Sequence, residues 1–120
     1  MSLAIKRVYE PVSAKDGVRV LVDRLWPRGL SKEGAAIDLW LKAVAPSSGL
    51  RQWFGHDPAK WPEFRKRYFA ELATHADELA QLRALAKRRR VTLVYGARDT
   101  EHNDAVALRD YLESQRAGEA

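Results

Sequence analysis

The sequence contains no cysteine, which excludes disulfide bonds, thiolate catalysis and cysteine-based zinc sites. It also lacks any apolar run close to the ~20 residues that a membrane-spanning helix needs, and no signal-peptide pattern opens the chain. Internal repeats, low-complexity tracts and linker-like segments are missing as well. These absences favour a cytoplasmic protein that has no membrane partner.

Several signatures of common enzymes are also missing. The chain has no G-x-G-x-x-G, no Walker sequence and no G-x-S-x-G, so the usual nucleotide-binding and hydrolase motifs are excluded. A metal site built from His56, Asp99 and His102 has no recognised ligand spacing, so we predict no metal site. The sequence identifies no cofactor, and it leaves the oligomeric state open.

What remains is the composition of one basic, folded domain. The chain has 120 residues and is 46% hydrophobic, which suffices for a single core but not for a second. We therefore expect one domain over residues 1–120. A formal net charge of +5 favours acidic partners such as nucleic acids, nucleotides or phosphorylated metabolites. The basic run at residues 87–90 is either a solvated helix C-terminus or a contact to a phosphate backbone.

Hydrophobic periodicity predicts alternating strands and helices. Apolar or alternating runs indicate strands at residues 4–9, 18–23, 37–42 and 91–95, with helix as an alternative for residues 37–42. Helices are predicted over residues 57–72, 74–90 and 104–115, and a frayed tail follows at 116–120. The order of elements from residue 37 onward is a βαβ pattern, which requires parallel strands. We therefore expect an α/β fold with a small, mostly parallel sheet flanked by helices, in a Rossmann- or flavodoxin-like layered architecture.

Capping signals mark the starts of the helices. Asp57 followed by Pro58 is typical of an N-cap and the first helical position. Thr74 and Asp77 resemble a capping box at the start of the next helix. The segment Pro46-Ser47-Ser48 closes the predicted strand at 37–42 and offers a further helix cap.

The densest chemistry follows the strand at 18–23, which leads into Asp23-Arg24-Leu25-Trp26-Pro27-Arg28-Gly29. Ligands of α/β proteins bind at the carboxyl ends of the strands. If the strands are parallel, one crevice is faced by Arg24, Arg28, Lys42, Arg98, Asp99 and His102. A cationic crevice predicts a phosphate or carboxylate site. The alternative is a structural network of ion pairs that joins Asp23 to Arg28 or Asp99 to Arg24.

A second dense stretch covers residues 53–58. Trp26 and Trp53 are candidates for the wall of a pocket, and the alternative for each is core packing. His56 lies in a turn before the helix cap, where it is either a general acid–base group or a loop-fixing residue. Asp99 and His102, three residues apart, are a candidate acid–base pair.

Two long motifs resemble the YeaO-like branch of the "domain of unknown function 488" family. They are the segments at residues 19–33 and 50–58, and similarity continues through Trp61, Phe64 and the loop after residue 95. Longer relatives have a strand ending in Asp-Val-Arg and a later strand ending in Cys-Ala-Glu before a Cys-His-Arg helix start. Asp23 and Arg24 match the first motif, whereas this chain has neither the cysteine nor the glutamate of the second. The resemblance therefore implies a fold and a site without naming a reaction.

Together these patterns predict an enzyme or binder that holds a small phosphorylated or nucleotide-like anion in a cationic crevice. The predicted binding residues are Asp23, Arg24, Trp26, Arg28, Lys42, Trp53, Arg98 and Asn103, and the predicted catalytic residues are Asp99, His102 and His56. The alternative is a nucleic-acid-binding module without catalysis that uses the basic run at residues 87–90 and exposed aromatic side chains.

Overall fold

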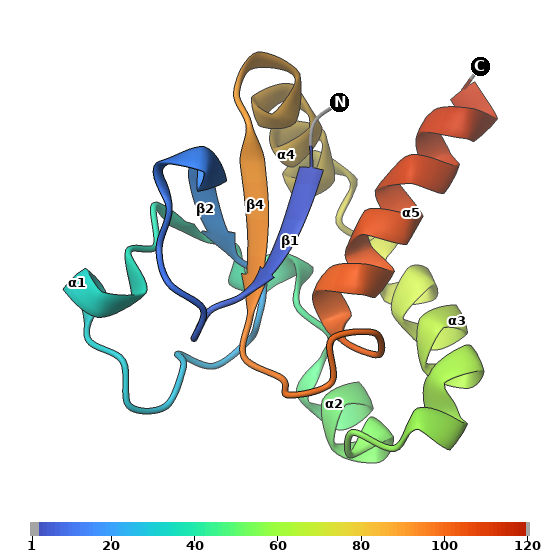
Figure 1. Ribbon diagram of the computed structural model, residues 1–120. Helices are drawn as coiled ribbons and strands as arrows, with labels where there is room; N and C mark the ends of the chain where they lie inside the picture. The colour runs from blue at the N-terminus through green and yellow to red at the C-terminus, as the bar shows by residue number, and fades with distance from the viewer. Residues whose placement is uncertain (1–2, 120) are drawn as a thin grey trace.

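The four strands of the computed structural model form one sheet in the order β1-β4-β2-β3 (Figure 1). The structure describes the backbone of residues 3–119 and the side chains of residues 3–114. The strands are β1 (Leu3–Arg7), β2 (Val18–Leu21), β3 (Leu39–Trp40) and β4 (Val91–Tyr95). Every neighbouring pair is parallel, and Val20 of β2 lies opposite Leu93 of β4. The sheet in the described part of the chain is thus wholly parallel, where a mostly parallel one was predicted.

The helices cover the two faces of the sheet unequally. They are α1 (Lys32–Ala35), α2 (Ser48–Phe54), α3 (Trp61–Leu72), α4 (Ala76–Arg88) and α5 (Asp104–Glu119). Helices α2 to α5 supply residues to the larger hydrophobic cluster on one face, while α1 and its flanking loops cover the other face (Figure 1). The predicted layered α/β architecture is confirmed.

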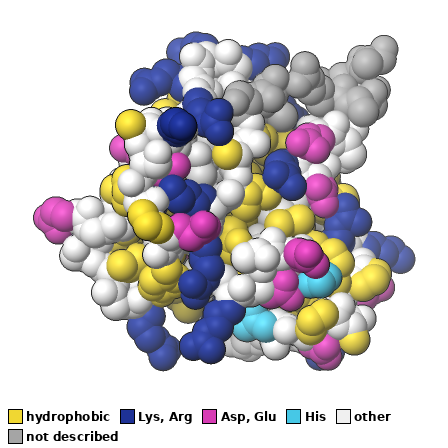
Figure 2. Space-filling model, in the orientation of Figure 1, with side chains coloured by type: hydrophobic (Ala, Val, Ile, Leu, Met, Phe, Trp, Pro, Cys, Tyr) yellow, Lys and Arg dark blue, Asp and Glu magenta, His cyan; other side chains and the backbone are white. Residues whose placement is uncertain are grey.

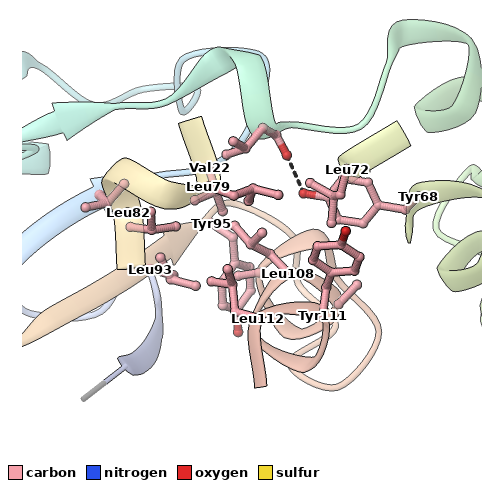
Figure 3. Packing of buried hydrophobic residues seen from close by; sticks show 14 of the residues in the cluster. Val22, Tyr68, Leu72, Leu79, Leu82, Leu93, Tyr95, Leu108, Tyr111 and Leu112 are labelled. Atoms are coloured by element: carbon pink, nitrogen blue, oxygen red, sulfur yellow. Dashed lines mark hydrogen bonds between the residues drawn. The ribbon is translucent and has the colours of Figure 1, made fainter. Parts of the chain in front are cut away.

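The alternation of side chains along the strands builds the two clusters. Val20 and Leu93 join the larger cluster, whereas Leu21 and Val94 join the smaller one, because successive side chains of a strand point to opposite faces. Leucines of α4 and α5 fill the space over the sheet (Figure 3). Tyr68 of α3 is fully buried among them and donates its hydroxyl hydrogen to the Val44 carbonyl, which satisfies the polar end of a core aromatic.

The least regular predicted strand is much shorter than expected. Strand β3 pairs with β2 only through Leu39 and Trp40, although the Asp38 and Leu41 N–H groups also donate to β2 carbonyls. A 3-10 turn, η2 (Lys42–Val44), ends it. The strand prediction is right over the helical alternative, and only its length is wrong.

The three predicted helix starts differ in outcome. Ser47 caps α2 by accepting a hydrogen bond from the Leu50 N–H, as its position suggested. The capping box at Thr74 is wrong, because this hydroxyl donates backward to the Glu71 carbonyl and α4 begins at Ala76 without a side-chain cap. The predicted cap at Asp57 is confirmed, because its side chain accepts a hydrogen bond from the Ala59 N–H and Pro58 takes the first helical position. The first turn is a 3-10 turn, η3 (Pro58–Lys60), which precedes α3.

The C-terminal helix is longer than predicted. Helix α5 extends to Glu119 rather than to Gln115, so the predicted tail at 116–119 is helical, and residue 120 lies outside the described residues. Within the described residues, no helix combines the length and the apolar character required to cross a membrane.

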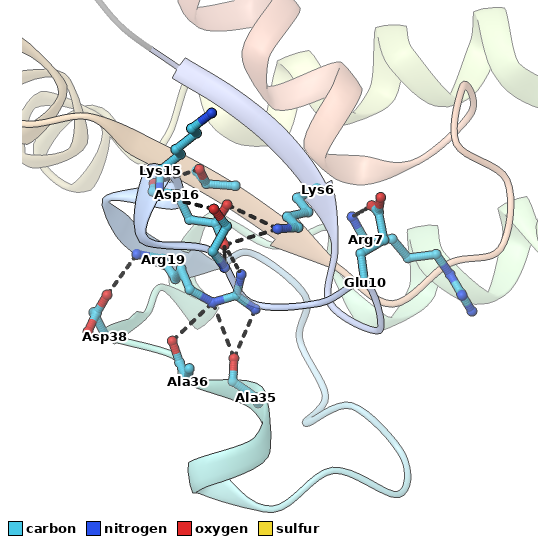
Figure 4. A network of polar contacts seen from close by, with 11 residues as sticks. Lys6, Arg7, Glu10, Lys15, Asp16, Arg19, Ala35, Ala36 and Asp38 are labelled. Carbon is cyan, nitrogen blue, oxygen red and sulfur yellow. Dashed lines mark hydrogen bonds and ion pairs between the residues drawn. The ribbon is translucent and has the colours of Figure 1, made fainter.

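One buried ion pair fastens the sheet to its loops (Figure 4). Arg19 of β2 is 3% exposed; its Nη1 lies 2.7 Å from Asp16 Oδ2, and its guanidinium also donates to the Ala35 and Ala36 carbonyls. Burial by itself would raise the pKa of Asp16, but hydrogen bonds from Ser13, Lys6 and Arg19 outweigh it and hold that pKa below its usual value. This network is satisfied within the fold, which suits a structural role.

Candidate functional site

A cavity of about 430 Å³ lies at the carboxyl ends of β2 and β4, where the sequence predicted a crevice. Its walls come from the turn after β2, the segment around α2, and the loop between β4 and α5. At this end of the molecule, basic side chains gather beside histidines and a hydrophobic surface (Figure 2). A volume of several hundred Å³ is that of a site for a small molecule.

Seven of the predicted site residues line this cavity: Asp23, Arg24, Trp26, Arg28, His56, His102 and Asn103. Four others are absent from its lining: Lys42, Trp53, Arg98 and Asp99. Of the six residues predicted to face one crevice at the ends of parallel strands, three line the cavity (Arg24, Arg28 and His102) and three do not (Lys42, Arg98 and Asp99).

Two of the residues outside the cavity lining, Lys42 and Trp53, make cation–π contacts elsewhere on the protein. Lys42 Nζ lies 4.1 Å from the centre of the Trp40 ring. Trp53 is flanked by the cations of Lys60 and Arg67, at 5.0 and 4.2 Å from its ring. Trp53 therefore binds the protein's own cations, and it is its neighbour Phe54 that lines the cavity.

Three arginines contribute to the cavity with different degrees of freedom. The guanidinium of Arg24 is held by the carbonyls of Pro46, at 3.0 Å from Nε, and Ala45, at 3.5 Å from Nη2. Arg28 and Arg51 are exposed, and within residues 3–114 no acceptor pairs with either guanidinium. Exposed, unpaired guanidiniums at the edge of a cavity are ready to bind a carboxylate or phosphate.

The alternative prediction, a structural network of ion pairs among the charged residues of the crevice, is not found in the described part of the chain. No ion pair there joins Asp23 to Arg28, or Asp99 to Arg24. Asp23 instead connects two strand ends, because its Oδ2 accepts a hydrogen bond of 2.8 Å from the Gly96 N–H and its carbonyl accepts one from Trp40 Nε1. A side chain at position 96 would crowd this contact, since a Cβ would lie 3.3 Å from Asp23 Oδ2.

Asp104 is the functional group that the sequence analysis missed. It begins α5, and its position there is that of an ordinary helix start; only the fold places its carboxyl in the same cavity as that of Asp23. Burial and the nearby charge of Asp23 raise the pKa of Asp104 well above the usual 3.8. Asp104 therefore holds its proton to a higher pH than an isolated aspartate does.

His102 is oriented by the residue predicted to be its partner. The ring atom Nδ1 lies 2.9 Å from Asp99 Oδ2, and the ring packs edge-on against Trp61 at 5.3 Å. Hydrogen bonds from the Glu101 N–H and from the His102 ring lower the pKa of Asp99. The predicted pair thus exists, with Asp99 outside the cavity fixing the ring of a histidine that lines it.

Two further predicted residues, His56 and Asn103, lie next to helix ends and line the cavity. His56 lines the cavity from a left-handed conformation, φ 57°, just after α2. Asn103 is 2% exposed; its Oδ1 accepts from the Val106 N–H at the start of α5, and its Nδ2 donates to the Asp99 carbonyl. The amide of Asn103 is therefore engaged in capping α5.

Aromatic and arginine residues that the sequence did not single out complete the walls. They include Tyr9, Arg51, Phe54 and Phe64. The rings of Phe54 and Phe64 are stacked at 4.3 Å, and Tyr9 is anchored by a hydrogen bond of 2.8 Å to the Arg28 carbonyl. Arg51 and Phe54 do lie in one of the motifs at residues 50–58, which is the signal that could have found them. Among the described residues, no group of three metal-ligating side chains is present.

The sequence of this chain is similar to those of known proteins. A family model described as the inactive DUF488-N3 subclade matches residues 2–120. The chain belongs to this family. It is 45% identical to the uncharacterised protein YeaO of Escherichia coli K12 over 114 residues, which cover 95% of this chain and 99% of YeaO.

Further relatives of this chain come from mycobacteria. The uncharacterised proteins Mb3100c of Mycobacterium bovis and Rv3073c of Mycobacterium tuberculosis are each 44% identical over 108 residues, or 90% of this chain and 91% of theirs. No solved structure matches the chain. The predicted resemblance to the YeaO-like branch is confirmed over nearly the whole length.

Proposed function

We propose that this protein binds a small phosphorylated or nucleotide-like anion in the cavity at the carboxyl ends of β2 and β4. The observation that carries the proposal is the convergence of Arg24, Arg28 and Arg51 on one cavity with aromatic walls. Guanidiniums bind phosphate and carboxylate groups through paired N–H donors. Two histidines, His56 and His102, add further donors at the same surface.

The charge balance of the cavity supports an anion over a cation. Three guanidiniums line it against two carboxyls, those of Asp23 and Asp104, and the pKa of Asp104 is raised by burial and by the charge of Asp23. The net charge of the lining is therefore positive even before the histidines are counted. A cavity with focused positive charge raises the local concentration of anions.

Binding is favoured over catalysis as the activity of this cavity. The family to which the chain belongs is described as inactive, and the chain lacks the cysteine and glutamate of the longer relatives' second motif. Asp99, one of the predicted catalytic residues, is absent from the cavity lining. His102 and His56 then act as hydrogen-bond donors to the ligand.

The test compares an arginine of the cavity with an arginine elsewhere. In Arg28→Ala, we expect the affinity for AMP to fall by about 10-fold or more, since a hydrogen bond to a charged group contributes roughly 1.5–3 kcal/mol. The free energy of unfolding should change by only about 0.5 kcal/mol, as for other exposed positions. Arg88→Ala, which removes an exposed arginine from the end of α4, is the matched control. Isothermal titration calorimetry and thermal melting give the two quantities.

One pair of results would contradict the proposal. If wild type binds neither AMP nor inorganic phosphate, and Arg28→Ala lowers the melting temperature much more than Arg88→Ala does, then the cavity arginines serve the fold and not a ligand.

Nucleic-acid binding is a second candidate with its own observation. Residues 87–90, at the end of α4, are all exposed, and they lie at the amino end of β4, opposite the cavity (Figure 1). Such a patch would contact phosphates without any involvement of Arg28. The acidic residues Asp77 and Glu78, in the first turn of the same helix, limit the length of the positive surface.

A further inference from the structure

The cavity contains one feature that an anion site alone does not require. Asp23 and Asp104 line it together with the arginines, and a carboxylate beside a bound phosphate is repulsive. The pair lies at the inner end, because both aspartates are half-buried, whereas Arg28 and Arg51 are exposed. The ligand must therefore present a different chemical group to this inner end.

The elements that hold the pair fix its geometry. Asp23 follows β2 and is anchored by the Gly96 N–H at 2.8 Å, and Asp104 begins α5 directly after the capping residue Asn103. Burial and the nearby charge of Asp23 favour the protonated form of Asp104, and a protonated carboxyl donates through its O–H group. The pair thus offers both an O–H donor and acceptor oxygens to the cavity.

We propose that the Asp23–Asp104 pair binds hydroxyl groups of the ligand, so that the ligand is a polyhydroxylated phosphate ester: a sugar phosphate or the ribose phosphate of a mononucleotide. This rests on the proposed binding of an anion by the arginines. A hydroxyl both donates and accepts hydrogen bonds, which matches a carboxylate beside a protonated carboxyl. Carboxylates at the ends of parallel strands bind ribose hydroxyls in this way in other α/β proteins.

Two alternative groups fit the inner end less well. An ammonium group would find a carboxylate there, but it would also meet the positive charge of the three arginines that line the same cavity. A purely apolar group would satisfy none of the remaining hydrogen-bonding capacity of the two carboxyls in a partly buried site, which is costly. The stacked rings of Phe54 and Phe64 give the apolar side of a sugar or base a surface to contact.

The experiment compares phosphates that differ only in what they carry. Isothermal titration calorimetry is run on the full chain with methyl phosphate, ribose 5-phosphate and AMP. We expect wild type to bind ribose 5-phosphate about 10-fold or more tightly than methyl phosphate, since hydrogen bonds to charged groups are worth that much. If AMP and ribose 5-phosphate bind equally, the ligand is a sugar phosphate, and if AMP binds more tightly, it is a nucleotide.

Variants assign the gain to the pair. Asp104→Leu, similar in size and unable to hydrogen-bond, should abolish the preference for ribose 5-phosphate and leave the affinity for methyl phosphate unchanged or higher. Asp104→Asn keeps a donor and an acceptor and should retain part of the preference even if the leucine variant folds poorly. Asp110→Leu, on the same helix and paired with Arg65 away from the cavity, should behave as wild type.

The outcomes separate this inference from the proposed function. Equal affinity of wild type for methyl phosphate and ribose 5-phosphate overturns the inference and leaves anion binding standing. A preference for the hydroxylated ester that survives in Asp104→Leu also overturns it. If none of the three phosphates binds, the proposed function fails, and the inference fails with it.

Discussion

At the scale of single residues, neighbours change what a side chain can do. Asp16 and Asp104 are both aspartates in the first turn of a helical segment, yet their pKa values move in opposite directions. Lysine and arginine partners lower the pKa of Asp16, whereas burial and a second carboxyl raise that of Asp104. The first arrangement is stable with its charge in place, and the second is suited to holding a proton.

The raised pKa of Asp104 predicts the pH dependence of stability. The folded state holds this proton more tightly than the unfolded state, whose pKa is near the usual 3.8. Stability is therefore fully present below that value and is lost as the pH rises through the folded-state pKa. Asp104→Asn removes this loss, so we expect the variant to gain about 1 kcal/mol over wild type at pH 8, a usual size for a single substitution, and much less at pH 4.

Denaturant unfolding at both pH values measures this difference. Asp77→Asn, which changes an exposed aspartate at the start of α4 outside the cavity, is the control. A gap between Asp104→Asn and wild type that is constant, or larger at pH 4, would show that the pair does not hold a proton in the folded protein.

At the scale of elements, the loop from Gly96 to Asn103 joins β4 to α5 and carries its own internal bonds. Asp99 accepts hydrogen bonds from the Glu101 and His102 N–H groups, and Asn103 caps the helix that follows. The loop thereby positions His102 in the cavity and Asp104 against Asp23. The order of this loop is thus a condition for both the histidine and the carboxyl pair.

The role of Asn103 in this loop can be measured. Asn103→Ala removes two part-buried hydrogen bonds, one of which is the cap of α5, so we expect the free energy of unfolding to fall by about 1–2 kcal/mol. Asn103→Ser keeps a capping oxygen and should lose less. Urea unfolding gives both values. A loss of AMP affinity in Asn103→Ala without a loss of stability would instead assign the amide to the ligand.

At the scale of the whole molecule, two basic regions lie at opposite ends of the sheet. The cavity arginines follow the carboxyl ends of the strands, and residues 87–90 precede the amino end of β4. Figure 2 shows basic side chains at both ends of the molecule in this view. Because β4 and its neighbours separate the two regions, a small ligand in the cavity cannot touch both.

This separation predicts independent effects on two kinds of ligand. Replacing Arg88, Arg89 and Arg90 together with alanine should leave AMP affinity unchanged. If the protein binds nucleic acid, the same variant should bind it more weakly, and the log–log salt dependence should flatten by about 0.9 for each lost phosphate contact to duplex DNA. Fluorescence anisotropy over a range of salt concentrations measures this. Weaker AMP binding in the triple variant would contradict the separation of the two regions.

Much of the architecture could be predicted from local patterns alone. The runs at residues 18–21 and 91–95 are apolar because these strands are buried on both faces, and buried parallel strands have this signature. Once the strands are parallel, their carboxyl ends share an edge, so the predicted meeting of Arg24, Arg28 and His102 followed from topology. Ser47 was found as a cap because capping depends on neighbouring residues only.

Which side chains enter the cavity was decided by the tertiary structure. Trp53 and Phe54 are adjacent on α2, where successive side chains differ by about 100° in direction, so the packing of α2 turns Phe54 inward and leaves Trp53 to Lys60 and Arg67. Lys42 does not line the cavity, because it begins η2, which follows β3, and its amine contacts the Trp40 ring.

The position of Asp104 in the cavity was also decided by the tertiary structure. Asp23 and Asp104 are far apart in the sequence, and neither position carries a local signal of the other. They line one cavity only because the fold brings the amino end of α5 and the turn after β2 to the same place. The sequence by itself determined the strands, most of the helices and the basic edge of the sheet, since these depend on periodicity and chain direction. The carboxyl pair and the side chains that face the cavity depend on how helices pack on the sheet, which only the tertiary structure decides.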